Sequence, residues 1–380
     1  MKKMLMLSSV ASMIDQFNMN NIAILHDLDV EVHVAANFIH GNSTSDEKVQ
    51  RFKEQLKQEN IPSFQIDFTR NMLRLDHHVQ AFKQLSDLIK REQYDFIHCH
   101  SPIGGAIGRI VAKMHNVPII YTAHGFHFYN DSSLMSWLIY YPIEKILSRY
   151  TDTLITINEE DYRRASKFQA KNCIYVPGVG IDLEKFSANR PVNEQVRQEF
   201  LTTDETDFVI LSVGELNKNK NHQVIIKALS NMNNPKVSFI HCGQGELEDE
   251  LKDLAKQLGV SKQVKFLGFR DDILDIYAAS DLFVFPSFRE GLPVSLMEAI
   301  ASGLPVIVSK IRGNEDLVEN ELGGFLFNPD NDKQLLDAVL TMYENPQLCQ
   351  DQVNYNLTMI KKFSTTRVNE MMEQLYSEYI

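Results

Sequence analysis

Two runs of alternating strand-like and helix-like segments, one in each half of the chain, constrain the fold most strongly. Short apolar runs rich in β-branched and aromatic residues predict the strands. In the first half they cover 3–8, 30–36, 63–67, 96–100, 118–122, 153–157 and 173–176. In the second half they cover 208–213, 237–242, 264–267, 282–285, 306–309 and 324–327. Helical patterns lie between them, and such alternation indicates parallel sheets wrapped by helices.

A Pro/Gly-rich break at 177–182 separates the two halves. A chain of 380 residues is long enough for two domains. We therefore expect an α/β fold with two doubly wound, Rossmann-like domains, 1–180 and 181–364, that face each other across a cleft. The last segment, about 365–380, is apolar on one helical face, and we expect this helix to pack back on the first domain.

Two carboxylates eight residues apart, Glu290 and Glu298, form the most informative local pattern. A predicted strand ends before Glu290, and the predicted helix at 294–302 carries Glu298. Open α/β sheets bind ligands at the carboxyl ends of their strands. Gly291 lets backbone approach a ligand closely, Pro293 suits the first helical position, and the helix start attracts phosphate. The carboxylates can accept hydrogen bonds from hydroxyl groups, and the helix start can bind phosphate. Together they indicate a ligand that carries both groups, a nucleotide sugar.

The formal net charge of −12 is unevenly placed. Residues 1–180 hold 19 basic and 19 acidic residues, so the excess negative charge lies in the second half. An acidic half argues against nucleic acid as a partner, because phosphate backbones require a basic surface. The neutral first half tolerates an anionic membrane surface. The simpler interpretation, that acidic charge keeps the protein soluble, stays open.

Cysteine spacing and the N-terminus bear on the compartment. The four cysteines are widely separated and form no Cys-x-x-Cys, which favours a reducing compartment. The first eleven residues superficially imitate a signal peptide, but a strand followed by a polar loop explains them better. The sequence has no run of 18 apolar residues that would predict a transmembrane helix.

A metal site is disfavoured. On a strand, His98 and His100 share one face while Cys99 points to the other, and a third ligand with suitable spacing is missing. The acidic tripeptide that begins at Asp27 precedes a strand, so we interpret it as a turn. We expect no metal and no cofactor.

In their order and spacing, the motifs resemble glycosyltransferase family 4, whose members are retaining enzymes of the GT-B architecture. The matching residues are the Glu290–Glu298 pair, His124-Gly125, Ser212-Val213-Gly214, Lys220, the Gly243-x-Gly245 turn and Gly268-Phe269. The resemblance spans the whole chain. The first half is similar to capsular and exopolysaccharide transferases.

The resemblance implies roles for individual residues. Glu298 would accept hydrogen bonds from the ribose hydroxyls, and Glu290 would hold donor-sugar hydroxyls near the reacting carbon. His124 would touch the transferred sugar through its side chain or its carbonyl. Lys220 would neutralise the donor diphosphate. The implied donor-binding set is Gly214, Lys220, Gly243, Gly268, Phe269, Arg289, Gly291, Leu292, Pro293, Val294 and Glu298.

One departure from the family concerns the phosphate clamp. Glu215 stands where the family usually places Arg, and a carboxylate beside a diphosphate would repel it. Either Glu215 turns away, or Lys218, Lys220 or Arg289 supplies the positive charge.

We expect the first half of the chain to bind the acceptor substrate. Asp15, in the expected loop after the first strand, would contact the acceptor, or it would cap a helix. Arg70 and Asn71 would meet an acceptor phosphate. The apolar, aromatic stretch 137–147 would rest on the membrane surface, or it would form a buried core helix.

These expectations describe a retaining, metal-independent glycosyltransferase. The donor would be a UDP-linked N-acetylated or deoxy sugar, such as N-acetyl-fucosamine. The acceptor would be an undecaprenyl-diphosphate-linked sugar in capsular polysaccharide biosynthesis, at the cytoplasmic face of the plasma membrane. A UDP-sugar epimerase of the same fold and a non-catalytic partner of a transferase are the alternatives. A dehydrogenase is disfavoured because the first strand-to-helix turn has no Gly-x-Gly-x-x-Gly.

Overall fold

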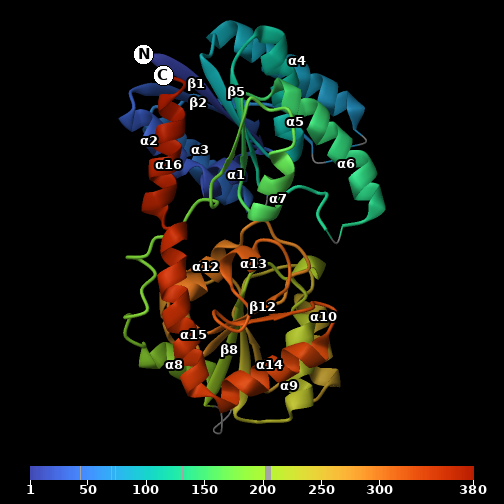
Figure 1. The fold of residues 1–380 in the computed structure, drawn as a ribbon, viewed down its shortest axis with the longest axis vertical. Coiled ribbons are helices and arrows are strands. Elements are labelled where there is room, and N and C mark those ends of the chain that lie inside the picture. The colour runs from blue at the N-terminus through green and yellow to red at the C-terminus, as the bar shows by residue number, and fades with distance from the viewer. Residues whose placement is uncertain (43, 70, 73, 131, 202–206) are drawn as a thin grey trace. The chain divides into compact units, whose positions relative to one another are not determined.

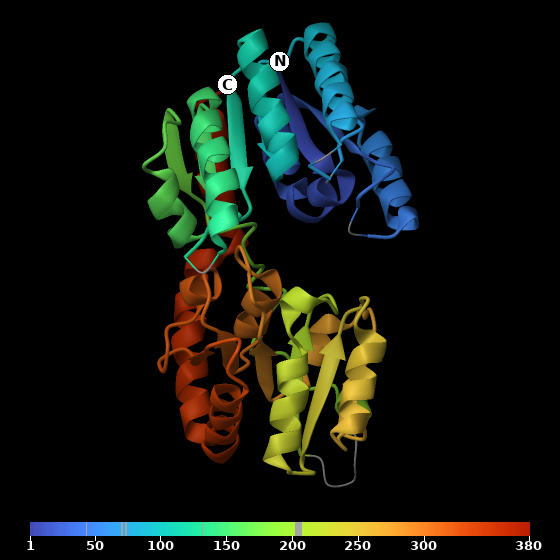
Figure 2. The same cartoon turned by 90° about the vertical axis from the view of Figure 1, so that its right-hand side faces the viewer.

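The computed structural model describes all residues except 43, 70, 73, 131 and 202–206. The chain divides into two compact units (Figure 1). The first unit is Met1–Val179 together with Thr366–Ile380, and the second is Gly180–Thr365. In each unit, helices cover both faces of a parallel sheet (Figures 1 and 2).

The first unit contains a seven-stranded parallel sheet in the order β3-β2-β1-β4-β5-β6-β7. Its strands are β1 (Lys2–Val10), β2 (Val30–Asn37), β3 (Ser63–Gln65), β4 (Phe96–His100), β5 (Ile119–Ala123), β6 (Thr153–Thr156) and β7 (Asn172–Tyr175). The strand order reverses between β1 and β4, which is where doubly wound sheets open a crevice for ligands.

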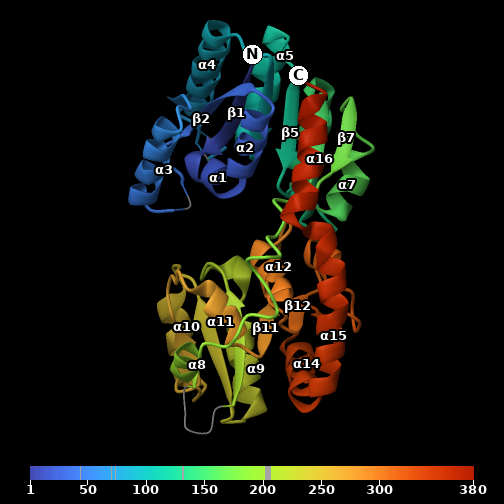
Figure 3. The same ribbon diagram turned by 90° about the vertical axis from the view of Figure 1, so that its left-hand side faces the viewer.

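Alternate side chains of β1 enter two different cores. Met4 and Met6 pack with α1 (Ala11–Phe17), α2 (Met19–Asp27), α3 (Asp46–Gln58) and α16 (Thr365–Ser377). Leu5 and Leu7 pack with α4 (Leu75–Glu92), α5 (Pro102–His115), α6 (Leu134–Leu147) and α7 (Glu159–Ala165). This alternation is what a strand buried on both faces requires. Figure 3 shows α16 alongside this sheet, although it comes from the far end of the chain.

The second unit contains a six-stranded parallel sheet in the order β10-β9-β8-β11-β12-β13. Its strands are β8 (Phe208–Val213), β9 (Val237–Cys242), β10 (Val264–Phe266), β11 (Leu282–Phe285), β12 (Val306–Ser309) and β13 (Phe325–Phe327). Its helices are α8 (Glu194–Phe200), α9 (Gln223–Met232), α10 (Glu248–Gln257), α11 (Ile273–Ala278), α12 (Val294–Ala301), α13 (Asn314–Leu317), α14 (Asp332–Glu344) and α15 (Pro346–Met359). Short 3-10 helices also occur in this unit, at η2 (Lys218–Lys220) and η3 (Ile360–Phe363), and in the first unit, at η1 (Ser148–Tyr150).

The polar loop expected after the first strand is instead helical. Helices α1 and α2 fill this segment, and Asn18 both ends the first and begins the second. The prediction that Asp15 lies in a loop or caps a helix is therefore wrong, because Asp15 lies inside α1. Val10 provides no side-chain cap for α1. Burial of Ile14 and Ile22 in the core holds these helices, and the sequence carries little local signal of that.

Among the described residues, no helix combines the length and the apolar composition that a bilayer crossing requires. The tripeptide beginning at Asp27 forms the predicted turn: Leu28 ends α2, and Asp29 adopts a left-handed conformation with φ of 57°.

Candidate active site

Lys220 and Glu290 form an ion pair in the second unit. Lys220 Nζ lies 2.8 Å from Glu290 Oε1, and the two side chains are 19% and 14% exposed. The ammonium group also lies 4.6 Å from the centre of the Phe285 ring. The pair forms because β8 and β11 are neighbours in the sheet, so the loops after them meet at its carboxyl edge. Two residues 70 positions apart in the sequence thus share one site.

Backbone contacts hold these two loops together. The Phe288 N–H donates to the Asn219 carbonyl at 2.8 Å, and Asn219 Nδ2 donates to the Arg289 carbonyl at 2.9 Å. The Asn217 side chain accepts from the Lys220 N–H at 3.1 Å. The loop after β8 is therefore held in place, and the position of Lys220 follows from it.

Glu298 lies on α12 and is mostly buried. One of its oxygens accepts a hydrogen bond from Tyr277 Oη at 2.9 Å. Burial raises the pKa of Glu298, while the Tyr277 hydrogen bond and the charge of Lys185 lower it. Pro293 is the N-cap of α12 rather than its first residue, because its ψ of 120° is extended. The first helical N–H therefore belongs to Val294.

Three glycines meet at the ends of β8, β9 and β10. The Gly243 N–H donates to the Gly268 carbonyl at 2.8 Å, and the Gly214 N–H donates to the Cys242 carbonyl at 3.0 Å. A Cβ atom on Gly243 would lie 1.8 Å from the Gly214 carbonyl oxygen, and Gly243 has a φ of 139°. Only glycine fits this position, so backbone forms this part of the edge.

Other members of the predicted donor-binding set differ in their exposure to solvent. Phe269 is 59% exposed, Arg289 is exposed and Leu292 is buried. The Glu215 side chain is exposed and accepts a hydrogen bond from Asn217 Nδ2 at 3.0 Å. Glu215 therefore has a partner other than Lys220, which is bonded to Glu290.

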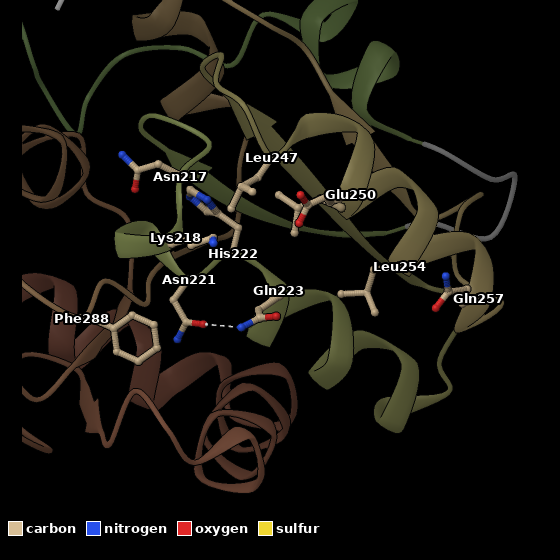
Figure 4. Close-up of a pocket in the computed structure, with 11 residues that line it drawn as sticks. Asn217, Lys218, Asn221, His222, Gln223, Leu247, Glu250, Leu254, Gln257 and Phe288 are labelled. Atoms are coloured by element: carbon tan, nitrogen blue, oxygen red, sulfur yellow. Dashed lines mark hydrogen bonds between the residues drawn. The ribbon is translucent and has the colours of Figure 1, made fainter.

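A cavity of about 460 Å³ lies between α9 and α10, beside the loop at 217–223 (Figure 4). Its described lining includes Glu250, Leu254 and the ring of His222, but neither Glu290 nor Glu298. Both ring nitrogens of His222 are buried without a hydrogen-bond partner among the described residues. Its ring meets His241 edge-on at 4.3 Å, and burial lowers the pKa of both imidazoles.

His124 follows β5 in the first unit and belongs to a group of three histidines. His124 Nε2 lies 3.1 Å from His100 Nδ1. The rings of His98 and His100 are 4.2 Å apart, on one face of β4 as predicted. Burial lowers the pKa of His124 to about 4, so the ring is neutral at physiological pH. Among the described residues, no group of three or more His, Cys, Asp or Glu is arranged to hold a metal ion.

Comparisons with known proteins identify the family. The profile of "Glycosyltransferase Family 4" matches residues 22–185, and that of "Glycosyl transferases group 1" matches residues 193–359. EpsD of Bacillus subtilis, a glycosyltransferase by name, is 32% identical over 386 residues, which is 100% of this chain and 97% of EpsD. The chain belongs to glycosyltransferase family 4.

One further relative of this family 4 glycosyltransferase and one solved structure of similar fold are informative. An Escherichia coli UDP-Gal:alpha-D-GlcNAc-diphosphoundecaprenol alpha-1,3-galactosyltransferase is 32% identical over 311 residues, 80% of each chain. The structure of Anabaena HepE in complex with UDP has a TM-score of 0.79 at 21% identity, over 100% of both chains. The predicted fold class, with two parallel α/β sheets of the GT-B type, is confirmed, and so is the prediction of a glycosyltransferase.

Of the acceptor residues predicted for this glycosyltransferase, the structure describes Asp15 and Asn71. Asp15 lies in α1, where burial raises its pKa. Asn71 is exposed, and Arg70 lies outside the described residues. A cavity of about 450 Å³ at the ends of β1, β2 and β3 has a described lining that includes His40, Arg74 and His77, but neither Asp15 nor Asn71.

Several residues that contact the predicted site residues were not themselves predicted. Arg312 is 6% exposed, and its Nε donates to the Glu290 carbonyl at 3.1 Å. Because Arg312 follows β12, the rule that selected Glu290 would also have found it. Tyr277 bonds Glu298 and His100 bonds His124, and no local sequence pattern marks these contacts.

Proposed function

We propose that this glycosyltransferase transfers a sugar from a UDP-sugar to an undecaprenyl-diphosphate-linked sugar, with retention and without a metal or other cofactor. The observation that carries the proposal is the Lys220–Glu290 ion pair at the carboxyl edge of the second sheet. The name of the E. coli relative, with a UDP-sugar donor and a diphosphoundecaprenol acceptor, supports both substrate classes. The UDP complex of HepE supports the nucleotide.

The donor nucleotide would use groups that the second unit already presents. Glu298 would accept bonds from the ribose hydroxyls, and Tyr277 Oη, 2.9 Å away, would hold its carboxylate in place. The close approach of Gly243 to Gly214 would leave backbone, rather than side chains, facing the nucleotide. The exposed ring of Phe269 would stack on the base.

The diphosphate would meet Lys220 and the first turn of α12. Pro293 has no N–H, so the donors there would be Val294 and the residues after it. Lys218 and the exposed Arg289 are further sources of positive charge. Glu215 would not oppose the phosphate directly if it keeps its hydrogen bond to Asn217. These cations would take the place of the arginine that the family usually has at position 215.

Glu290 would act at the sugar. When the diphosphate provides Lys220 with a second anionic partner, the carboxylate of Glu290 becomes available to the donor-sugar hydroxyls. It would also face the positive charge that develops at the reacting carbon. In a front-side substitution the leaving phosphate accepts the proton of the attacking hydroxyl. In the first unit, we assign His124 to contact with the transferred sugar. The protein then contributes positioning and electrostatics.

The outer face of α6 supports a membrane-bound acceptor. Large apolar side chains on this face are exposed, from 39% to 73%, and they are Leu134, Met135, Leu138, Ile139, Ile143 and Ile146. Within α6 only Glu144 and Leu147 are buried, so the alternative of a buried core helix is wrong. Lys145 and Arg149 are exposed beside this face. We propose that it rests on the cytoplasmic, anionic surface of the plasma membrane.

The acceptor phosphate and the sugar complete the proposal. His40, Arg74 and His77 line the cavity of about 450 Å³ in the first unit and are the described basic groups suited to a phosphate. For the donor sugar we propose an N-acetylated or deoxy sugar, such as N-acetyl-fucosamine. The pathway would be capsular polysaccharide synthesis, because the first half of the sequence is similar to capsular and exopolysaccharide transferases, and we propose the capsular enzyme CapM as a protein that it resembles.

A product assay tests the proposal. The purified protein is incubated with radiolabelled UDP-sugars, with and without undecaprenyl-diphosphate-linked sugar in vesicles. We expect label to enter the lipid only when the acceptor is present. Isomerised UDP-sugar formed without acceptor would instead identify an epimerase. Full activity of Glu290→Ala would contradict the role of Glu290. In a thermal-shift screen, stabilisation by GDP- or ADP-sugars but not UDP-sugars would overturn the donor assignment.

A further inference from the structure

The hydrogen bond between His100 and His124 raises the question of which ring donates. His100 Nδ1 and His124 Nε2 are 3.1 Å apart, and both rings are neutral because burial disfavours the charged form. A neutral imidazole carries one N–H and one lone pair. The donor in this bond therefore determines where His124 carries its proton.

The second nitrogen of His100 decides between the two arrangements. His100 Nε2 is buried and has no hydrogen-bond partner among the described residues. If Nε2 carried the proton, a buried N–H donor would be left unpaired. If Nδ1 carries it, only a lone pair is unpaired. Unpaired buried N–H groups are rarer than unpaired acceptors, so Nδ1–H is the favoured form of His100.

The ring of His100 is held by its neighbour on β4. The His98 ring lies 4.2 Å away, and both of its nitrogens are bonded. His98 Nδ1 is 2.8 Å from Tyr376 Oη on α16, and His98 Nε2 is 2.8 Å from Thr122 Oγ1. His98 is therefore fixed on both sides. This packing restricts rotation of the His100 ring and keeps Nδ1 aimed at His124.

We propose that His100 is a positioning residue that donates its Nδ1–H to His124 Nε2, so that His124 carries its own proton on Nδ1. This inference deepens the proposed function and rests on it for the contact between His124 and the sugar. With Nε2 occupied as an acceptor, the His124 side chain presents a neutral Nδ1–H donor. It would donate to an oxygen of the transferred sugar and would not remove a proton from the acceptor.

The tautomers can be observed directly, independently of activity. Long-range ¹H–¹⁵N correlation spectra of protein labelled with ¹⁵N-histidine distinguish Nδ1–H from Nε2–H. The spectra of His100→Asn and His124→Gln assign the two rings. We expect both His100 and His124 to be protonated on Nδ1 at neutral pH. An Nε2–H signal for His124 would overturn the proposal, even if the enzyme is an active transferase.

Substitutions at His100 test the consequence. Asn retains an N–H donor near the position of Nδ1, Asp offers only acceptors, and Leu offers neither. We expect His100→Asn to keep kcat within about threefold, and the Asp and Leu variants to lose about tenfold or more with little change in KM for the UDP-sugar. Trp137 fluorescence, which reports on the unit that contains His100, serves as the folding control. Equal kcat for the Asn and Asp variants would contradict the proposal. Absence of transfer by the wild type would contradict the proposed function instead, and the spectra would still decide the tautomer.

Discussion

Lys220 Nζ is bonded to Glu290 Oε1 at 2.8 Å, so the cation assigned to the diphosphate is already neutralised by the carboxylate assigned to the sugar. The roles of the two side chains are therefore coupled. Any ligand that engages Lys220 changes the environment of Glu290, and a substitution at one position alters the other.

The first prediction separates binding from chemistry. Glu290→Gln leaves Lys220 without its anionic partner, so we expect tighter UDP binding, by a few-fold, together with a kcat lower by about 10²–10³. Lys220→Met should weaken UDP binding. Isothermal titration calorimetry and steady-state kinetics measure the two effects. Glu215→Gln, at an exposed carboxylate, is the control and should change UDP affinity little. Weaker UDP binding by Glu290→Gln would refute the shared role of the pair.

The second prediction concerns the glycine contact. Gly243→Ala would place a Cβ atom 1.8 Å from the Gly214 oxygen, so we expect a loss of about 3 kcal/mol or more in unfolding free energy, with loss of UDP binding. Gly259→Ala is the matched control, because its φ is also positive, at 75°, but nothing lies within 4 Å. That change should cost about 1 kcal/mol. Equal losses in urea unfolding would show that conformation alone, and not the contact, constrains Gly243.

The third prediction is the acid sensitivity of the first unit. Burial lowers the pKa of His98 to about 3, whereas the unfolded chain binds the proton near pH 6.5. The unfolded state therefore binds more protons below pH 6.5, and this histidine contributes stability that is lost as pH falls towards 3. At pH 5 the loss is about 2 kcal/mol for this one group.

Urea unfolding at pH 7.5 and pH 5 measures this loss. Fluorescence of Trp137, the one tryptophan of the chain, reports on the first unit. His98→Gln keeps hydrogen-bonding groups but does not titrate. It should therefore lose less stability between the two pH values than the wild type loses. The same loss in both proteins would contradict the assignment.

The fourth prediction concerns the membrane. Leu138 is 63% exposed on α6, so Leu138→Glu should lower binding to anionic vesicles and transfer to a lipid acceptor about tenfold. UDP affinity should not change. Leu322→Glu, at a side chain 52% exposed in the second unit, is the control and should bind vesicles like the wild type. Sedimentation with vesicles provides the measurement, and equal binding by all three proteins would exclude α6 as the contact.

The fifth prediction concerns the buried anchor of α6. Arg109 is fully buried, and its Nη1 donates to Glu144 Oε2 at 2.8 Å. Glu144→Ala would leave a buried charge without a counterion and should lower the unfolding free energy by about 3–5 kcal/mol. Urea unfolding followed by Trp137 fluorescence measures this loss. The double variant Arg109→Met/Glu144→Leu should be more stable than the single one. If both are equally destabilised, packing rather than charge dominates this contact.

Much of the fold followed from local patterns. The predicted bounds of β8, β9, β11 and β12 agree with the structure residue by residue, because each is an apolar run bounded by turn residues. Helices α1 and α2 were missed, since burial rather than capping stabilises them. The stretch that contains α6 was ambiguous, because apolar residues predict a buried helix and a surface-binding helix equally well.

Part of the candidate site could likewise be predicted from the sequence, and part of it could not. Residues that directly follow strands, such as Glu290, could be found from the rule that loops at the carboxyl edge bind ligands. The bond between Tyr277 and Glu298, and that between His100 and His124, depend on how separate segments pack. The pairing of Lys220 with Glu290 depends on the order of strands in the sheet, which the sequence pattern alone does not specify.

The last helix has a consequence for engineering chimeric enzymes. Because α16 fills part of the core around β1, the first unit is encoded by two separate stretches of the gene. A single crossover near residue 180 would give a hybrid whose N-terminal half is completed by a foreign α16. Tyr376, which bonds His98, would then come from the other parent. Recombination that exchanges the donor-binding half therefore needs two junctions, near 180 and 365, so that the native tail is retained.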